Sequence, residues 1–182
     1  MKITALTALV CATVLTACST THHEHAEVYA PQSAVAVMSG TIGNAQVRGV
    51  VTFTQMDGYV HVAAEVEGLA PGRHGIHVHE FGDCNCGDGK CTGGHFNPFG
   101  VDHGGPDAAV RHVGDLGNLE VGADGKASYS RDDKHIALDM SSRACIIGRA
   151  IIIHGGEDDL TSQPTGAAGA RLATGVIGIG KD

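Results

Sequence analysis

Short runs of apolar and β-branched residues alternate with turns rich in glycine, aspartate and asparagine from residue 34 to the end of the chain. Many of these runs have the two-residue period of a strand with one buried and one exposed face. The pairs Asp57-Gly58 and Asp124-Gly125 suit tight hairpin turns between such strands. The pattern predicts strands at residues 34–39, 46–55, 59–66, 75–80, 115–121, 127–130, 136–139, 145–154 and 171–179.

Eight or nine short strands are typical of an antiparallel sandwich or barrel. Two stretches, residues 81–114 and 155–170, carry no strand pattern. Loops of this length are uncommon in a compact domain unless they are functional or are held by metal or disulfides. We therefore expect most of the chemistry of this protein to lie in these two loops.

The composition argues against several classes of protein. The 27 glycines among 182 residues are about twice the usual share, which disfavours a helical bundle because glycine weakens helices. The formal net charge of -8 leaves no extended basic surface, so we expect no nucleic-acid partner. The 12 histidines equal the lysines and arginines combined, and this number calls for a chemical explanation.

The first residues carry the features of an export signal. Lys2 precedes an apolar stretch at residues 3–15, which is too short to span a membrane. The next residues, Leu15-Thr16-Ala17-Cys18, resemble a bacterial lipobox, which implies cleavage before Cys18 and acylation of that cysteine. We expect residues 1–17 to be a lipoprotein signal peptide and Cys18 to be the only attachment to a membrane. A plain secretory signal is the alternative.

Residues 18–33 are polar, contain His22, His23 and His25, and show no hydrophobic period. We interpret this segment as a flexible tether, with a weak metal-scavenging tail as the alternative because neutral imidazoles bind Cu(II) and Zn(II). Residues 34–182 then form the folded domain. An exported domain of this kind works in an oxidising space where disulfides can form.

Candidate metal ligands begin with His77 and His79, which lie in a predicted strand. Residues i and i+2 of a strand point to the same face, so the two imidazoles form a ready chelate. His154 ends another predicted strand that is strongly apolar.

The first long loop adds further candidate ligands. His95, His103 and His112 lie in it, and Asp115 follows three residues after His112. Nitrogen-rich sites suit copper or zinc, and a site with one carboxylate suits zinc. The histidines and the aspartate therefore predict two metal sites.

Five segments contain these residues at characteristic spacings, and together they closely resemble the signatures of the copper/zinc superoxide dismutase family. The resemblance covers about residues 34–180, and the combination of motifs is highly specific. The segments are Gly75-Ile76-His77-Val78-His79-Glu80-Phe81-Gly82-Asp83, His95-Phe96-Asn97-Pro98, His103-Gly104-Gly105-Pro106, Arg111-His112-Val113-Gly114-Asp115-Leu116-Gly117-Asn118 and Gly175-Val176-Ile177-Gly178-Ile179.

The resemblance implies an all-β fold, an eight-stranded Greek-key β-barrel of the immunoglobulin-like sandwich type, with two long functional loops. It also implies one copper and one zinc per subunit, with His95 bridging the two metals. The implied copper ligands are His77, His79, His95 and His154, and the implied zinc ligands are His95, His103, His112 and Asp115.

Two further residues match functional positions of the family. Asp158, four residues after His154, matches a carboxylate that hydrogen-bonds to ligands of both metals; the alternative is an ordinary acidic loop residue. Arg171 matches the arginine beside the copper that guides the anionic substrate. The resemblance thus makes Arg171 and His95 the catalytic residues.

The implied activity is the disproportionation of superoxide to dioxygen and hydrogen peroxide. The alternative is a non-catalytic periplasmic copper buffer or carrier that uses the cysteine cluster and the histidine tail. With Cys18 acylated, the protein would sit on the periplasmic side of the outer membrane of a Gram-negative bacterium; without acylation it would be periplasmic or secreted. We also expect a homodimer.

The cysteines depart from the family pattern. The family usually has a disulfide from the metal loop to the last strand, but this chain has Thr174 at the strand position. The domain contains four cysteines, which allow three complete pairings, and the sequence does not choose among them. Three interpretations remain open: a disulfide within the loop or to Cys145 of the same or a neighbouring subunit, a thiolate site for copper loading or storage, and free thiols. The four cysteines are Cys84, Cys86, Cys91 and Cys145.

Overall fold

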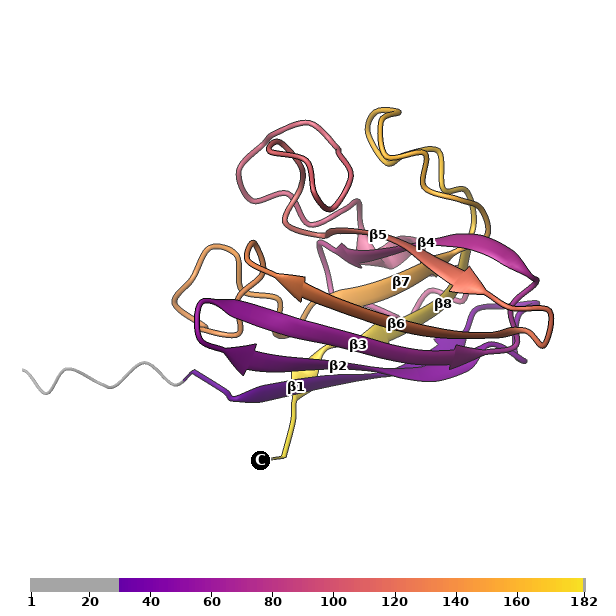
Figure 1. Cartoon of the computed structure of the whole chain (residues 1–182). Coiled ribbons are helices and arrows are strands. Elements are labelled where there is room, and N and C mark those ends of the chain that lie inside the picture. Colours follow the sequence, from indigo (N-terminus) through magenta and orange to yellow (C-terminus); the bar gives the residue numbers. More distant parts are fainter. Residues whose placement is uncertain (1–29, 182) are drawn as a thin grey trace, which may run out of the picture.

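A computed structural model describes residues 30–181, and its strands form one twisted antiparallel barrel (Figure 1). The expected signal peptide, the acylation site Cys18 and most of the expected tether lie outside the described residues. Within the described range, no helix is long and apolar enough to cross a membrane. The elements are β1 (Ser33–Gly40), β2 (Arg48–Met56), β3 (Tyr59–Glu67), β4 (Gly72–His79), the short 3-10 helix η1 (Lys90–Thr92), β5 (Asp115–Val121), β6 (Lys126–Asp133), β7 (Ala150–His154), β8 (Arg171–Val176) and β9 (Gly178–Ile179).

The strands follow the order β5-β4-β7-β8-β1-β2-β3-β6, and β9 pairs with β1. All of these pairs are antiparallel. The two end strands, β5 and β6, lie beside one another, so the barrel is nearly closed. The connections from β3 to β4 and from β6 to β7 join strands that are not neighbours, as in a Greek key. The expected all-β barrel is confirmed.

The barrel wall formed by β2 follows the predicted alternation. Val51 and Phe53 are fully buried in the core, whereas Thr52 and Thr54 are exposed. Burial of one such apolar side chain stabilises a fold by about 1.5–3 kcal/mol. The alternation therefore fixes which face of this strand is inside.

β4 and β7, in contrast, are buried on both faces. Ile76 and Val78 of β4 belong to the hydrophobic core, so the alternate residues His77 and His79 lie on the outer face of the barrel. These histidines are nevertheless buried, with at most 1% of their surface exposed. The two long loops rise on this side of the barrel (Figure 1). The candidate site consequently lies between the barrel wall and the loops.

Two of the predicted strands were wrong in part. Residues 136–139 form only an isolated bridge, between Ala137 and Cys145, and β7 begins at Ala150 rather than at residue 145. Ile136 and Ile146 are buried all the same. Their apolar pattern reflects packing of a connection against the core, and packing needs no strand ladder.

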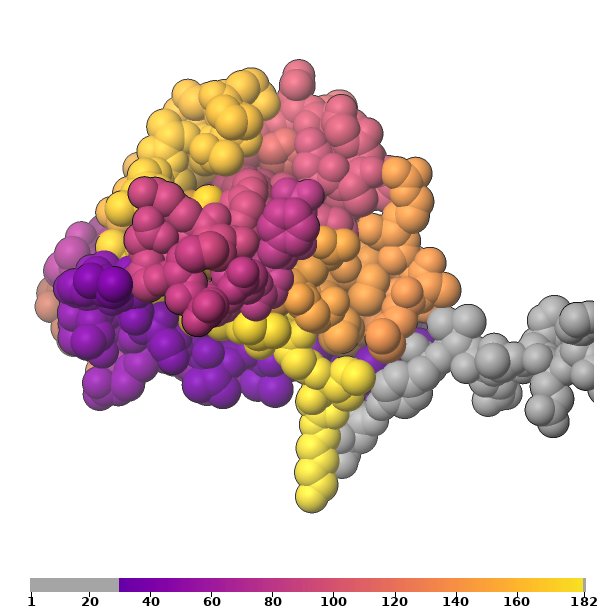
Figure 2. Space-filling view, turned by 180° about the vertical axis from the view of Figure 1, so that it is seen from behind, coloured from indigo at the N-terminus to yellow at the C-terminus, as the bar shows by residue number. Residues whose placement is uncertain are grey.

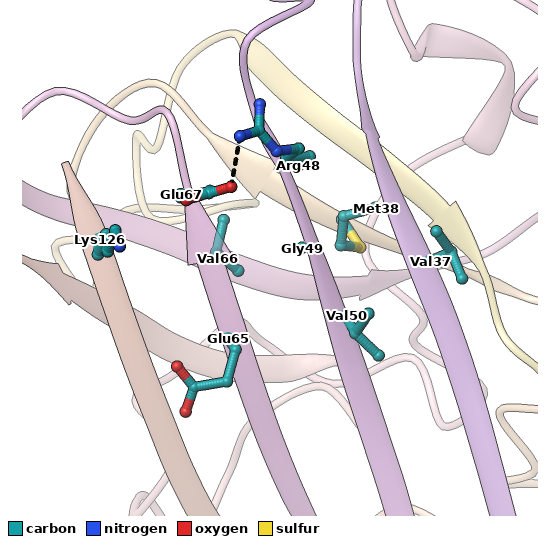
Figure 3. Close-up of a pocket in the computed structure, with 9 residues that line it drawn as sticks. All are labelled: Val37, Met38, Arg48, Gly49, Val50, Glu65, Val66, Glu67 and Lys126. Atoms are coloured by element: carbon teal, nitrogen blue, oxygen red, sulfur yellow. Dashed lines mark ion pairs between the residues drawn. The ribbon is translucent and has the colours of Figure 1, made fainter.

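A shallow groove of about 500 Å³ crosses the outer face of β1, β2, β3 and β6 (Figure 3). The Arg48 guanidinium pairs with the Glu67 carboxylate at 2.6 Å along this groove. None of the residues that line the groove is a candidate site residue. The candidate site residues therefore lie elsewhere, under the two long loops.

Candidate metal centre

The first long loop is attached to β4 by its backbone. Phe96 donates its N–H to the Val78 carbonyl at 2.8 Å, and Val78 donates its N–H to the Gly114 carbonyl at 2.9 Å. His95 forms an isolated bridge with His79. These contacts place His95 beside the two strand histidines, and they return the chain to the barrel just before β5.

The second long loop, residues 155–170, adjoins the first one on the same side of the barrel (Figure 2). Gly75 of β4 donates its N–H to the Gly156 carbonyl at 2.9 Å. The Asn118 side chain accepts the N–H of Asp158 at 2.8 Å and donates to its carbonyl at 2.9 Å. Asp158 is thereby fixed under the loop, where it is fully buried.

A first cluster of imidazoles lies where β4, β7 and the first loop meet. Nε2 of His79 and Nε2 of His154 are 3.3 Å apart. Nδ1 of His77 and Nε2 of His95 are buried and have no hydrogen-bond partner among the described residues. Because an unpaired buried polar atom is unfavourable, a bound metal ion fits these nitrogens as the missing partner. One nitrogen from each ring lies within 4.8 Å of the other three, in His77, His79, His95 and His154.

A second cluster is centred on the Asp115 carboxylate, which begins β5. Its oxygens lie 2.8 Å from Nδ1 of His95 and 3.0 Å from Nδ1 of His103. Nδ1 of His112 is 3.1 Å away. The backbone N–H groups of Gly104 and His112 donate to the same carboxylate and fix its orientation. Three imidazole nitrogens and one carboxylate oxygen are a donor set that suits tetrahedral zinc.

The Asp158 carboxylate touches both clusters. One oxygen lies 2.8 Å from Nε2 of His77, and the other lies 2.9 Å from Nε2 of His103. The Leu160 N–H also donates to it at 2.8 Å. A carboxylate that accepts the outer N–H of a ligating imidazole fixes the ring orientation and leaves the inner nitrogen free for metal.

The two clusters differ in charge when no metal is bound. Burial lowers the pKa of His95 to about 4 and the pKa of His154 to about 3, and neighbouring imidazoles contribute to both shifts. These rings are therefore neutral at pH 7. Burial also opposes the charge of His103, but the Asp115 and Asp158 carboxylates outweigh it and raise the pKa of His103 to about 9. The second cluster thus holds a proton that a metal ion has to displace.

Arg171 opens β8 directly opposite His154 on β7. Its Nη1 donates to the Gly89 carbonyl at 2.6 Å and to the Thr92 hydroxyl at 3.1 Å, and its Nη2 donates to the Gly93 carbonyl at 2.6 Å. The strand register and these three contacts place a half-buried cation next to the first cluster.

The structure resolves the cysteine pairing that the sequence left open. Cys86 and Cys91 form a disulfide with a Cα–Cα separation of 5.5 Å. Cys84 and Cys145 are free and half-buried. Neither group of potential metal ligands found in residues 30–181 contains a cysteine.

Gln163 supports the centre, and sequence reasoning missed it. Its side-chain oxygen accepts the N–H of His103 at 2.8 Å, and its side-chain nitrogen donates to the carbonyl of His103 at 2.9 Å. It therefore ties the second long loop to the backbone of a candidate ligand. No local pattern distinguishes this glutamine from an exposed loop residue.

A buried ion pair holds the last part of the first loop, and it was also missed. Arg111 Nη2 lies 2.5 Å from the Asp133 carboxylate, and neither side chain is exposed. Arg111 also donates to the carbonyls of His112 and Asp115 at 3.1 and 2.9 Å. Arg111 and Asp133 are 22 residues apart in the sequence, and their ion pair anchors the segment with His112 and Asp115 to the barrel.

Two adjoining clusters of buried imidazoles, joined by the single ring of His95, define a binuclear metal-binding β-barrel protein. Residues 47–177 match the family model described as copper/zinc superoxide dismutase. The chain therefore belongs to the copper/zinc superoxide dismutase family. Its cofactors are copper and zinc, and it is an oxidoreductase that disproportionates superoxide to dioxygen and hydrogen peroxide.

Individual relatives agree with this assignment. The extracellular superoxide dismutase [Cu-Zn] of Drosophila melanogaster is 45% identical over 181 residues, which are 93% of each chain. The superoxide dismutase [Cu-Zn] of Paramecium bursaria Chlorella virus 1 is 45% identical over 161 residues, covering 84% of this chain and 81% of the relative. The crystal structure of the clock protein EA4 is similar with a TM-score of 0.75 and 43% identity, over 83% of this chain and 96% of that chain.

Proposed function

We propose that the first cluster holds the copper ion and the second cluster holds the zinc ion. The observation that carries this assignment is the position of His95, whose Nε2 is buried without a partner while its Nδ1 lies 2.8 Å from Asp115. One imidazole can therefore serve both ions. The first cluster offers four imidazoles, a set that suits copper, and the second adds a carboxylate, which suits zinc.

When bound, copper supplies one-electron redox chemistry by alternating between its +2 and +1 states. The side chains of the protein supply the binding and proton steps. His95 holds and returns one proton at Nε2, which faces the first cluster, while Asp115 keeps Nδ1 oriented toward the second cluster. The overall reaction consumes two protons for every two superoxide ions, and both come from water, one of them by way of His95.

Arg171 binds and orients the substrate in this proposal. Superoxide is an anion, whereas the whole chain has a formal net charge of -8. A local cation must therefore overcome the field of the protein at the site. The guanidinium of Arg171, fixed beside the first cluster, is the side chain in position to do this.

The residue assignment is tested with single variants of the metal-loaded protein. His154→Ala should lose copper and superoxide consumption but retain zinc, because His154 belongs to the first cluster alone. His103→Ala should lose zinc preferentially. Metal content is measured by mass spectrometry and superoxide decay by pulse radiolysis. Unchanged activity in His154→Ala would refute the copper assignment, and tight binding of both metals without superoxide consumption would favour a copper carrier.

A homodimer is proposed from an apolar surface. Val37, Phe81, Val176 and Ile179 are 45–67% exposed. Val37 and Val176 line the same hollow, and Ile179 lies on β9, which pairs with the strand of Val37. Exposed apolar patches of this kind mark protein interfaces. The variant Val37→Glu/Val176→Glu should be monomeric by light scattering and retain its metals, and an unchanged molar mass would contradict the proposed surface.

Export is proposed from the N-terminal sequence, with residues 1–17 as the signal, residues 18–33 as the tether and residues 34–182 as the dismutase domain. The extracellular relative supports a secreted location. Acylation at Cys18 would anchor the protein to the periplasmic side of an outer membrane. Intact-mass analysis of the mature protein should show an acylated Cys18, and Cys18→Ala should leave the membrane fraction. A mature protein without an acyl chain would refute the lipid anchor, and plain secretion would be the remaining explanation.

A further inference from the structure

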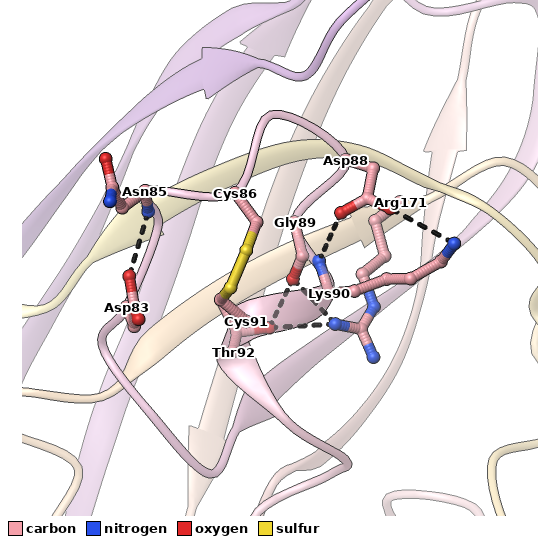
Figure 4. The surroundings of a disulfide bond; sticks show 9 residues. All are labelled: Asp83, Asn85, Cys86, Asp88, Gly89, Lys90, Cys91, Thr92 and Arg171. Carbon is pink, nitrogen blue, oxygen red and sulfur yellow. Dashed lines mark hydrogen bonds and ion pairs between the residues drawn. A yellow bond between two sulfur atoms is a disulfide. The ribbon is translucent and has the colours of Figure 1, made fainter.

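The Cys86–Cys91 disulfide closes a small loop directly against Arg171 (Figure 4). The Gly89 carbonyl, inside the closed loop, accepts from Arg171 Nη1 at 2.6 Å. The hydroxyl of Thr92, just after the disulfide, is a second acceptor for the same nitrogen. One of the three acceptors of the guanidinium therefore lies inside the disulfide loop, and the other two, Thr92 and Gly93, follow the loop directly.

The closed loop is braced internally in one conformation. Gly89 donates its N–H to the Cys86 carbonyl at 2.9 Å, and the N–H and hydroxyl of Thr92 both donate to the Gly89 carbonyl. Gly89 has a φ of 73°, a conformation that glycine adopts at no steric cost. On the far side, Ile42 donates its N–H to the Gly87 carbonyl at 2.7 Å. The loop therefore presents one carbonyl oxygen toward β8 at a defined point.

The contact between this loop and the last long strand is not covalent. A methyl group on Gly89 would lie 3.0 Å from Cγ2 of Thr174 and 3.4 Å from Cβ and Cδ of Arg171. Thr174 stands at the strand position where the family pattern has a cysteine, so no disulfide ties the loop to β8. Among residues 30–181, the disulfide within the loop is the one covalent cross-link that constrains the position of the Gly89 carbonyl.

The loop adds no net charge beside Arg171. Lys90 is its exposed cation, and its ammonium pairs with the Asp88 carboxylate at 3.1 Å. Replacing two bonded cysteines with serines also changes no charge. Any effect of opening the loop on the anion site is therefore an effect of geometry.

We propose that the Cys86–Cys91 disulfide is a positioning element for Arg171. By fixing the Gly89 carbonyl, it holds the guanidinium at the place where a small anion binds, and it thereby sets the affinity of the site for superoxide and similar anions. This inference rests on the proposed role of Arg171. It concerns orientation only, since neither Cys86 nor Cys91 belongs to a group of candidate metal ligands among residues 30–181.

The test compares two double variants of the metal-loaded protein. Cys86→Ser/Cys91→Ser opens the loop, and Cys84→Ser/Cys145→Ser makes the same chemical change at the two free thiols. Azide serves as the anion probe, and its dissociation constant is read from the visible absorption of the copper protein. The opened variant should bind azide about tenfold more weakly, or about 1.4 kcal/mol, with unchanged copper and zinc content. The control should match the parent protein.

A second readout needs neither metal nor activity. The Nε–H group of Arg171 is followed by nitrogen NMR relaxation in the metal-free protein, where an ordered guanidinium gives a high heteronuclear NOE. Opening the loop should lower this NOE while the NOE of Arg149, which donates to other carbonyls, stays unchanged. Parent-like azide affinity and an unchanged Arg171 NOE would overturn the inference.

Two more variants separate this inference from the proposed function. Arg171→Met should weaken azide binding; if it does not, the proposed role of Arg171 fails first. If the opened variant does not fold, Gly89→Ala tests the same geometry with the disulfide intact, because the added methyl group presses on Arg171 and Thr174. Weaker azide binding in Gly89→Ala supports the inference, and parent-like binding overturns it.

Discussion

Replacing Asp158 with alanine tests how the protein holds two metal sites with one carboxylate. The change removes the acceptor for the outer N–H of His77 and of His103, and it also releases the N–H of Leu160. The two histidines should respond differently. His77 remains fixed in β4, which is paired on both sides, by β5 and β7. His103 lies in a loop, where its backbone is held by Gln163.

The expected magnitude follows from the hydrogen bonds that are lost. A hydrogen bond to a charged group contributes about 1.5–3 kcal/mol, and loss of such an outer contact typically lowers metal affinity about 10–100-fold. Most of this loss should fall on the zinc site, because only His103 loses its orientation. We expect copper affinity to fall less than about tenfold, since the strand still orients His77.

The assay is competition with a chromophoric chelator for each metal, at constant pH. Asp159→Ala is the matched control, because its carboxylate lies in the same loop but accepts only from the neighbouring turn, from the N–H groups of Thr161 and Ser162 and from the Thr161 hydroxyl. The control should keep both affinities. The reasoning would be refuted if both variants lost the same metal affinity, or if Asp158→Ala lost affinity for copper and kept its affinity for zinc.

Three further predictions follow from other contacts. Zinc must displace the proton on His103, whose pKa is about 9, so the affinity of the metal-free protein for zinc should fall about tenfold per pH unit below pH 9. The affinity for copper should not change between pH 9 and pH 6, because the pKa of His95 is about 4. Titration calorimetry measures both affinities. Arg111→Met leaves the buried carboxylate of Asp133 without its main partner and should lower the free energy of unfolding by about 3–5 kcal/mol in urea titrations; a loss below about 1 kcal/mol would contradict the buried pair. The loop between β7 and β8 contains no lysine or arginine, so the rate of superoxide consumption should change little with ionic strength, whereas a steep fall with added salt would show that charges beyond Arg171 steer the substrate.

The strand pattern predicted the barrel well because burial alternates along β1, β2, β3 and β6, and because the strands buried on both faces are short apolar runs bounded by turns. It failed at residues 136–139 and 145–149, where Ile136 and Ile146 are buried in a connection. Apolar residues there fill the core without a strand ladder. Hydrophobicity reports burial, and only hydrogen bonding across the sheet decides whether a buried segment is a strand.

The structure brings together the histidines and the aspartate that the sequence predicts as ligands, but the residues that support them were not predicted. Metal ligation needs particular side chains, and those side chains stand at spacings that the sequence displays. Gln163 and Asp133 carry no such local signature, because each acts through a residue that is distant in sequence. Their roles follow from which loop packs against which strand.

The sequence by itself determined the all-β class, the two long loops and the histidines that meet beneath them, because strand alternation and ligand chemistry are local properties of the chain. The tertiary structure alone decided that Cys86 pairs with Cys91, and that the loop so formed holds Arg171 beside His154. Four cysteines permit several pairings of similar local plausibility. The choice among them depends on how the folded loop packs against β8, and no local sequence pattern specifies that contact.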